Sequence, residues 1–188
     1  MLNRIFALVF LVVLFPLLVI VGLLVYFQLG RPVLFYQQRV GKNQELFTII
    51  KFRTMKKNKG ANQKKVVPRI GRFLRKWKLD ELPSLWNIVK GDMVFVGPRP
   101  YIPEHASIYK EEELLVFTVK PGITSPASIK YIGEDKFLQN KEKAQEYNKS
   151  HLFPDKIRMN IDYVNRKCFW YDIKIIYWTL IRKKIDLD

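Results

Sequence analysis

The chain has 188 residues, which suits one domain or a small domain with a membrane anchor. It carries 33 lysines and arginines against 17 aspartates and glutamates, a net charge of +16, and 48% of its residues are hydrophobic, which excludes a disordered chain. A single cysteine, Cys168, excludes an internal disulfide framework. The two histidines, His105 and His151, are far apart in the sequence, which argues against a zinc site built from His and Cys.

The charge is divided sharply along the chain. Residues 1–30 hold one charged side chain, Arg4, whereas residues 31–100 hold 17 basic and 4 acidic side chains. Residues 101–188 are nearly balanced, with 15 basic and 13 acidic side chains. This division predicts a membrane-inserted segment over residues 1–30 and a cytoplasmic, membrane-associated domain over residues 31–188.

Residues 5–29 form a run of 25 without a charged side chain. As a helix the run would be ~37 Å long, which exceeds the ~30 Å of a bilayer's hydrocarbon core. A secretory signal peptide fits poorly, because the run is too long and no small-residue cleavage site follows it. We therefore predict a membrane helix that is retained.

Pro16 lies near the middle of this run, where a proline removes a helical hydrogen bond and favours a kink. Two forms follow: a kinked span, or a re-entrant helix whose two ends lie on one side of the membrane. Basic residues flank both ends, Arg4 on one side and Arg31 and Arg39 on the other, which suits two cytoplasmic ends. We favour the re-entrant form, although a kinked span is compatible with the same charges.

The rest of the chain is predicted to be α+β and mostly helical, with a small β element. Residues 33–36 and 46–52 are rich in β-branched and aromatic side chains and predict a short strand pair. The polar run 56–65 predicts an exposed, mobile loop. Residues 104–113 and 134–150 are typical of polar helices.

Two further segments predict amphipathic helices. In residues 70–77 apolar side chains, Trp77 among them, recur at helical spacing between basic ones. In residues 168–181 Phe169, Ile173 and Tyr177 fall on one helical face. Each helix can pack its apolar face into a core or lie in the membrane interface, and the spacing leaves both possibilities open.

Acidic residues are scarce in the basic middle of the chain, yet two of the four there, Asp80 and Glu81, are adjacent. They begin a short predicted helix that ends at Gly91. One interpretation is simple capping of that helix by Asp80. The other is an anion site at a helix start surrounded by Lys and Arg, where carboxylates can hold Mg²⁺ or attack phosphorus.

Three basic segments are candidates for phosphate binding. An apolar strand over residues 93–96 leads into a turn in which Pro98 and Pro100 restrict the backbone around Arg99. A guanidinium held in this way suits bidentate contact with phosphate, or an ion pair with a nearby acid. Lys51 and Arg53 lie two residues apart on a predicted strand. A Pro-Gly turn over residues 120–124 is predicted to follow another apolar strand.

In this order the motifs resemble the bacterial sugar transferases known as monotopic phosphoglycosyl transferases. The motifs are KFRTM (residues 51–55), LDELPSLWNIVKGDMVFVGPRP (79–100) and KPGIT (120–124). The resemblance extends from the apolar head to FWYDIKIIYWT (169–179), so it covers nearly the whole chain. Its middle motif is long and highly specific.

The resemblance implies transfer of a sugar-1-phosphate from a UDP-sugar to undecaprenyl phosphate, with release of UMP. It implies Mg²⁺ and a covalent aspartyl phosphosugar intermediate, in the first membrane step of a surface glycan or glycoconjugate pathway. It places the enzyme in the bacterial inner membrane, with its catalytic domain on the cytoplasmic face and membrane lipids as partners. No nucleic-acid partner is expected.

The same resemblance implies roles for individual residues. Asp80 would be the nucleophile and Glu81 its catalytic partner, and both carboxylates would bind the metal. Arg99, with Pro98 and Pro100, would lie at the phosphates or the uridine, and Lys51 and Arg53 at the phosphates. Two positions depart from the family pattern: residues 124–128 read TSPAS where KPGITG is common, and Phe15 precedes the membrane proline where a polar residue is common.

Two other classes of protein fit parts of the sequence. A membrane-anchored basic protein could bind anionic lipid or nucleic acid, but it would not explain adjacent acids inside the most basic stretch. A membrane-bound phosphohydrolase could use the same carboxylates and metal. A requirement for lipid phosphate in product formation would distinguish a transferase from it.

Overall fold

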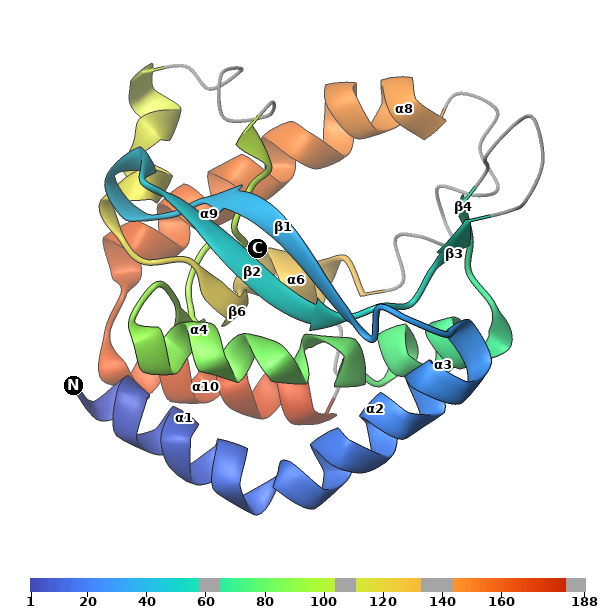
Figure 1. The fold of residues 1–188 in the computed structure, drawn as a ribbon. Helices are drawn as coiled ribbons and strands as arrows, with labels where there is room; N and C mark the ends of the chain where they lie inside the picture. The colour runs from blue at the N-terminus through green and yellow to red at the C-terminus, as the bar shows by residue number, and fades with distance from the viewer. Residues whose placement is uncertain (58–64, 104–110, 133–143, 182–188) are drawn as a thin grey trace. The chain divides into compact units, whose positions relative to one another are not determined.

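A computed structural model describes residues 1–57, 65–103, 111–132 and 144–181 (Figure 1). The described residues are mostly helical, and their strands form three two-stranded sheets, β1 with β2, β3 with β4, and β5 with β6. The predicted α+β class with a small β element is confirmed. The chain divides into two compact units, residues 1–38 with 47–92 and residues 39–46 with 93–188, which are taken in turn.

The first unit begins with the predicted apolar run, which is broken into two helices. α1 covers Leu2–Val13 and α2 covers Phe15–Leu29, and the pair is bent by 64° at Leu14. Pro16 lies in the first turn of α2, where its missing N–H breaks no helical bond. Among the described helices, none has by itself the length and apolar composition needed to cross a membrane. The α1–α2 pair is the one bent pair among them that has both when its two helices are taken together.

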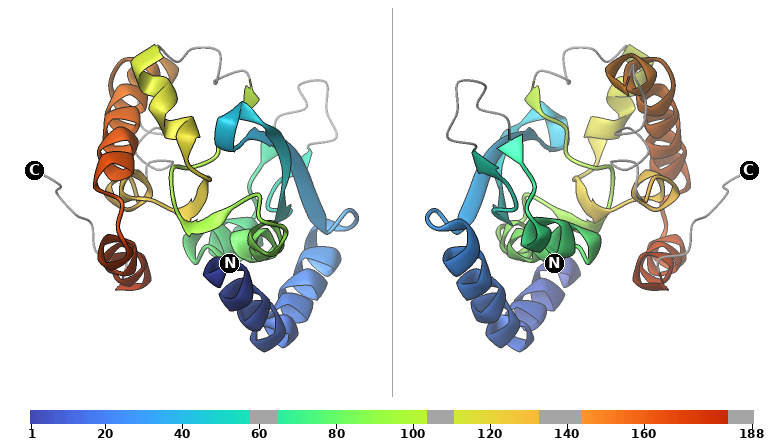
Figure 2. Two further views of the ribbon diagram at one scale, coloured as in Figure 1. Left: turned by 90° about the vertical axis from the view of Figure 1, so that its left-hand side faces the viewer. Right: turned by 90° about the vertical axis from the view of Figure 1, so that its right-hand side faces the viewer.

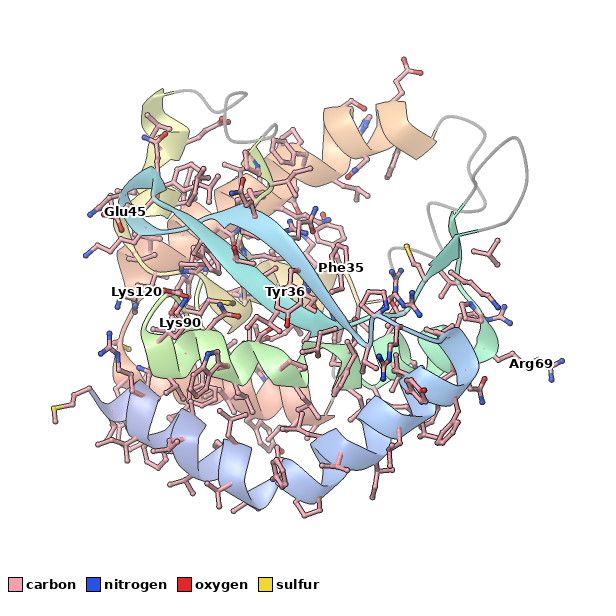
Figure 3. All side chains as sticks on the ribbon, in the orientation of Figure 1. Phe35, Tyr36, Glu45, Arg69, Lys90 and Lys120 are labelled. Atoms are coloured by element: carbon pink, nitrogen blue, oxygen red, sulfur yellow. The ribbon has the colours of Figure 1, made fainter. Side chains whose placement is uncertain are left out.

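The outer sides of α1 and α2 are apolar and uncovered. Figure 3 shows side chains drawn almost entirely in carbon along both helices. Phe6, Phe10, Phe15 and Phe27 are among the exposed ones. On the inner side α1 packs on α4 and α2 packs on α3 (Figures 1 and 2), so both arms of the bent pair return to the same unit.

The remaining elements of the first unit follow the predictions closely. They are β1 (Leu34–Val40), β2 (Leu46–Phe52), β3 (Lys56–Lys57), β4 (Lys65–Val66), α3 (Arg69–Lys76), the 3₁₀ helix η2 (Leu79–Ser84) and α4 (Leu85–Lys90). The strand pair is confirmed, and β1 is longer than predicted. The predicted loop lies largely outside the described residues, but its ends pair as β3 and β4.

The core of the first unit packs the apolar helix α2 against strand β2 and the basic helix α3. Val25 and Leu29 of α2 are buried with Phe52 of β2 and Leu74 of α3. The helix predicted over residues 70–77 is confirmed, and its apolar side chains divide between two environments. Leu74 is fully buried, whereas Phe73 and Trp77 are about half exposed. Core packing therefore accounts for only part of its apolar face.

The second unit contains two parallel strands covered by helices. Its elements are η1 (Lys42–Gln44), β5 (Val94–Val96), η3 (Glu111–Thr118), β6 (Gly122–Thr124), α6 (Pro126–Lys130), α8 (Ala144–Tyr147), the π-helix η4 (Asn148–Leu152), α9 (Phe153–Arg166) and α10 (Phe169–Ile181). One core cluster contains Val96, Ile129, Tyr163 and Ile175, and a second contains Val40, Val116 and Phe117.

Predictions for the second unit have mixed outcomes. The helix over residues 168–181 is confirmed, and Phe169, Ile173 and Tyr177 on its predicted face are exposed. The apolar strand predicted before the Pro-Gly turn is wrong, because residues 111–118 form a 3₁₀ helix and the strand is the turn segment itself. Residues 104–110 and 133–143 of the predicted polar helices lie outside the described residues.

Candidate active site

Two buried polar side chains fasten the helical segment η2–α4 to strand β2. The amide of Asn87, which is fully buried, accepts from the Ile50 backbone N–H at 3.1 Å and donates to the Thr48 carbonyl at 2.8 Å. The hydroxyl of Ser84 donates to the Ile50 carbonyl at 2.8 Å. These bonds replace a neighbouring strand, and they fix the middle of the segment against the strand that carries Lys51.

Glu81 and Lys51 form an ion pair at the start of that segment. The Lys51 Nζ donates to Glu81 Oε1 at 2.7 Å, and the two side chains are only 16% and 9% exposed. A charge-assisted bond with so little access to water has a fixed geometry and resists screening by salt. The structure thus brings together two of the residues predicted from separate motifs.

Asp80 lies beside this pair and is not used as a cap. The residue is 9% exposed, and η2 has no hydrogen bond from a capping side chain. Within the described residues its Oδ1 is buried and has no hydrogen-bond partner. Burial, followed by the neighbouring Glu81 carboxylate, raises the pKa of Asp80, and Lys51, Lys78 and Arg75 oppose this shift only in part.

A structural role as a helix cap does not explain these properties of Asp80. A buried acidic oxygen without a donor costs free energy in folding, so capping does not account for Asp80. A cation or an electrophile that reached this oxygen would displace no hydrogen-bond donor of the described residues. Basic side chains surround it without pairing to that oxygen, which suits an anionic substrate.

The carboxylates of Asp80 and Glu81 fit Mg²⁺ that is shared with a substrate. In the part of the chain that the structure describes, no group of three or more His, Cys, Asp or Glu side chains could hold a metal. Mg²⁺ is commonly held by one or two carboxylates, with water and substrate phosphates as the other ligands. The unpartnered Oδ1 of Asp80 beside Glu81 meets that smaller requirement.

We expect Asp80→Asn to raise the melting temperature of the protein at pH 7 in buffer without Mg²⁺. The raised pKa of Asp80 means that the folded state holds this proton more tightly than the unfolded state does. Below the ordinary pKa of 3.8, Asp80 is protonated in both the folded and the unfolded state, so it does not destabilise the fold. The loss of folding stability caused by its charge grows as the pH rises through the pKa of the folded state. The gain should shrink as the pH is lowered from 7 toward 4.

Thermal unfolding in detergent micelles checks this expectation. Asp162→Asn is the matched control, since Asp162 is a partly exposed carboxylate that pairs with Arg166 on α9 and should give no gain. A lower melting temperature for Asp80→Asn than for the parent at pH 7 would contradict the assignment of Asp80 as a strained buried acid.

The Pro-Arg-Pro turn belongs to the second unit and is held from several sides. β5 pairs in parallel with β6, and Gly97 and Pro98 of the turn after β5 contact residues 120–122 of the KPGIT segment. A Cβ on Gly97 would lie 2.6 Å from the Lys120 carbonyl oxygen, and one on Gly122 would lie 2.1 Å from the Gly97 nitrogen. Only glycine permits these two backbones to approach so closely.

Hydrogen bonds fix the two prolines on either side of Arg99. The Pro98 carbonyl accepts from the Gly122 N–H at 2.9 Å, and the Pro100 carbonyl accepts from Arg39 Nη1 at 3.1 Å. Both prolines are buried, while the Arg99 side chain is exposed. A small hollow beside Arg99 is lined by residues that include Tyr101 and Phe117. The backbone on both sides of Arg99 is thus held in place, while the role of its guanidinium at a phosphate stays a prediction.

Residues that the motifs did not suggest also support this turn. The buried Tyr163 hydroxyl donates to Asp172 at 2.7 Å and lies 3.0 Å from the carbonyl oxygen of Val96, the last residue of β5. Burial and the Asp172 carboxylate raise the pKa of Tyr163, which therefore stays protonated. Thr179 of α10 bonds to Thr124 of β6 at 2.7 Å. Asp172 and Thr179 are polar residues in the largely apolar helix α10, and they were the sequence signal for these contacts.

The structure places Arg53 at the end of α2. Its guanidinium donates to the carbonyls of Leu29, Gly30 and Arg31, and its backbone N–H donates to Val33. Lys51, Asp80 and Glu81 thus come together in the first unit, where Arg53 contacts the exit of the apolar helix. Pro98, Arg99 and Pro100 belong to the second unit.

Comparison with known proteins gives a consistent match. The family model described as "Bacterial sugar transferase" matches residues 1–184. The uncharacterized sugar transferase EpsL of Bacillus subtilis is 34% identical over an alignment of 158 positions, which covers 81% of this chain and 70% of that protein.

Two longer relatives are also similar. The UDP-glucose:undecaprenyl-phosphate glucose-1-phosphate transferase of Escherichia coli is 34% identical over 89% of this chain and 36% of its own length. The undecaprenyl-phosphate glucose phosphotransferase of Komagataeibacter xylinus is 32% identical over 89% of this chain and 32% of its own length. This chain therefore corresponds to about a third of either one.

Proposed function

We propose, since this chain belongs to the bacterial sugar transferase family, that it transfers a sugar-1-phosphate from a UDP-sugar to undecaprenyl phosphate and releases UMP. Membership of the family makes the chain a sugar transferase, the phosphoglycosyl transferase class of enzyme that the motifs predict. The single observation that carries the proposed chemistry is the buried, unpartnered Oδ1 of Asp80 beside the Lys51–Glu81 pair. The name of the Escherichia coli relative supports the donor and the acceptor, and that of the Komagataeibacter xylinus relative supports the acceptor.

The reaction has two displacements at the same phosphorus. A carboxylate oxygen of Asp80 attacks the phosphorus that bears the sugar, and the bond from that phosphorus to the bridging oxygen breaks, so UMP leaves with the electron pair. A phosphate oxygen of undecaprenyl phosphate then attacks the same phosphorus. The acyl phosphate bond breaks, which restores the Asp80 carboxylate and gives the lipid diphosphosugar.

The other site residues stabilise charge around this phosphorus. Lys51, held by Glu81, supplies a positive charge for the donor phosphates. Glu81 keeps Lys51 in position and adds a second carboxylate beside Asp80. For Arg99, which belongs to the second unit, a role at the phosphates or the uridine stays a prediction of the family resemblance. When bound by Asp80, Glu81 and the donor, Mg²⁺ supplies charge neutralisation at the diphosphate.

The bent helix pair supports a re-entrant membrane anchor on the cytoplasmic face of the inner membrane. Both arms return to one unit, which a straight span could not achieve. Their exposed side is apolar over nearly its full length. The acceptor phosphate lies at the membrane surface, so an anchor that holds the site at that surface suits the reaction. Lipid, and not nucleic acid, is the partner that an apolar outer face implies.

We expect both ends of the helix pair to be inaccessible from the periplasm. Single cysteines replace Asn3 and Arg31 in a Cys168→Ser background, because Cys168 is exposed and would react itself. Intact spheroplasts are treated with a thiol reagent that does not cross the membrane, and lysed cells serve as the control. Labelling of position 3 in intact spheroplasts, with position 31 protected, would establish a span instead.

The identity of the released nucleotide tests the proposed function. Purified protein is incubated with UDP-sugars and Mg²⁺, with and without undecaprenyl phosphate. We expect UMP as the nucleotide product, with sustained turnover only when the lipid phosphate is present. UDP as the main product would indicate attack at the sugar carbon and contradict the proposal. Sustained UMP release without lipid would indicate the phosphohydrolase.

A further inference from the structure

The Arg53 side chain is hydrogen-bonded to backbone carbonyls at the point where the apolar helix α2 ends. Its Nη2 donates to the Leu29 carbonyl and, at 2.6 Å, to the Gly30 carbonyl, and its Nη1 donates to the Arg31 carbonyl at 3.1 Å. Gly30 has a φ of +73°, a conformation that turns the chain at the helix end. Three successive carbonyls therefore converge on one guanidinium.

This arrangement has a clear electrostatic basis. The last carbonyls of a helix have no partner within the helix, and they carry the negative end of its dipole. A planar guanidinium with several donors can satisfy several of them at once, which a lysine cannot. Charge-assisted bonds of this kind are short and strong. Both terminal nitrogens of Arg53 are bonded to carbonyls, and within the described residues its Nε is buried without a hydrogen-bond partner, so Arg53 is poorly suited to be a phosphate ligand.

The other contacts of the same segment lead directly to the candidate site. Lys51, two residues before Arg53, is bonded to Glu81, and Phe52 between them is buried against Leu29. Residues 51–53 thus touch the site and the helix exit within three consecutive positions. The exit itself has residues typical of a membrane interface, because Arg31 lies over the ring of Tyr26 at 5.8 Å.

We propose that Arg53 is a positioning residue that fixes the exit of α2 to strand β2 and so sets the height of the Lys51–Glu81–Asp80 site above the lipid. The inference rests on the proposed function, because it assigns the effect of Arg53 to one of the two displacements. The UDP-sugar is soluble and can reach the site at any height. Undecaprenyl phosphate is embedded, so only its attack depends on where the membrane surface lies.

Three assays of Arg53→Lys and Arg53→Ala separate this role from others. The first is the burst of UMP from UDP-sugar without acceptor. The second is turnover with a short, water-soluble polyprenyl phosphate, and the third is turnover with undecaprenyl phosphate in lipid nanodiscs. We expect the first two to stay within about threefold of the parent and the third to fall by ~10-fold or more. Arg72→Ala removes an exposed charge from α3 and serves as the matched control.

Each other pattern would overturn the proposal. An equal loss in all three assays would show that Arg53 only supports the fold. A loss confined to the burst would show that it binds the donor phosphates. Full activity of Arg53→Lys in nanodiscs would show that the three-carbonyl contact is not needed, and this variant keeps the charge if Arg53→Ala does not fold.

Amide hydrogen exchange provides a readout that does not depend on activity. Exchange over residues 26–33 should be faster in both Arg53 variants than in the parent, while residues 79–90 should be unchanged. Unchanged exchange at residues 26–33 would overturn the positioning role. If the parent releases no UMP at all, the proposed function fails, and the exchange experiment still decides whether Arg53 holds the helix exit.

Discussion

Asp80→Asn is expected to abolish both the burst of UMP and the formation of a phosphosugar adduct on the protein. The amide keeps the size of the carboxylate but loses the negative oxygen that would attack phosphorus. Removing a covalent nucleophile commonly costs ~10⁴- to 10⁶-fold in rate, which makes this the largest effect that the proposed site predicts. Rapid-quench measurement of UMP, with UDP-sugar, Mg²⁺ and no lipid acceptor, checks it.

Asp162→Asn is the control for this experiment, because it removes a carboxylate from α9 and should leave the burst unchanged. The higher melting temperature expected for Asp80→Asn separates lost chemistry from lost folding. A burst of normal size in Asp80→Asn would place the chemistry on another residue. Glu81→Gln is expected to slow the burst and keep its size, because Glu81 acts beside the nucleophile.

Lys51→Ala is expected to lower turnover by ~10²- to 10³-fold, the usual cost of losing one well-placed donor to a transition-state phosphate. Two physical effects act together. The substrate loses a cation, and Glu81 is left as a buried charge without its partner at 2.7 Å. Because Lys51 also lowers the pKa of Asp80, its removal should raise that pKa further and weaken the nucleophile near neutral pH. Steady-state UMP release measures the loss.

A second variant separates the two effects of Lys51. Lys51→Ala with Glu81→Gln leaves no unpaired charge and should recover thermal stability while activity stays low. Lys56→Ala, on β3, the next strand along the chain, removes an exposed lysine and should behave like the parent. Turnover of Lys51→Ala within a few-fold of the parent would remove Lys51 from the phosphate site.

Much of the site could be predicted because its residues lie in compact motifs. Asp80, Glu81 and Arg99 stand out from the sequence as adjacent acids in a basic stretch and an arginine between two prolines. The contact between Lys51 and Glu81 was not visible in the spacing, since it depends on Asn87 and Ser84 acting as a substitute strand for β2. Such side-chain to backbone pairing leaves no periodic pattern.

The elements that sequence patterns missed are those decided by tertiary contacts. Residues 111–118 have the apolar content of a strand, yet Val116 and Phe117 bury themselves from a 3₁₀ helix. The two basic residues of KFRTM have different partners. β2 places Lys51 beside Glu81, whereas it places Arg53 beside the carbonyls at the end of α2. By contrast, the break in the apolar run has a direct signal in the sequence, which is Pro16.

The adduct on the parent protein tests the central claim most directly. The enzyme is incubated with UDP-sugar and Mg²⁺ without lipid acceptor, digested under mildly acidic conditions, and its peptides are analysed by mass spectrometry. The proposed mechanism predicts one sugar-phosphate per chain, on Asp80, that disappears when undecaprenyl phosphate is added. A sugar-phosphate on any other residue, or full turnover with lipid and no adduct without it, would contradict that mechanism.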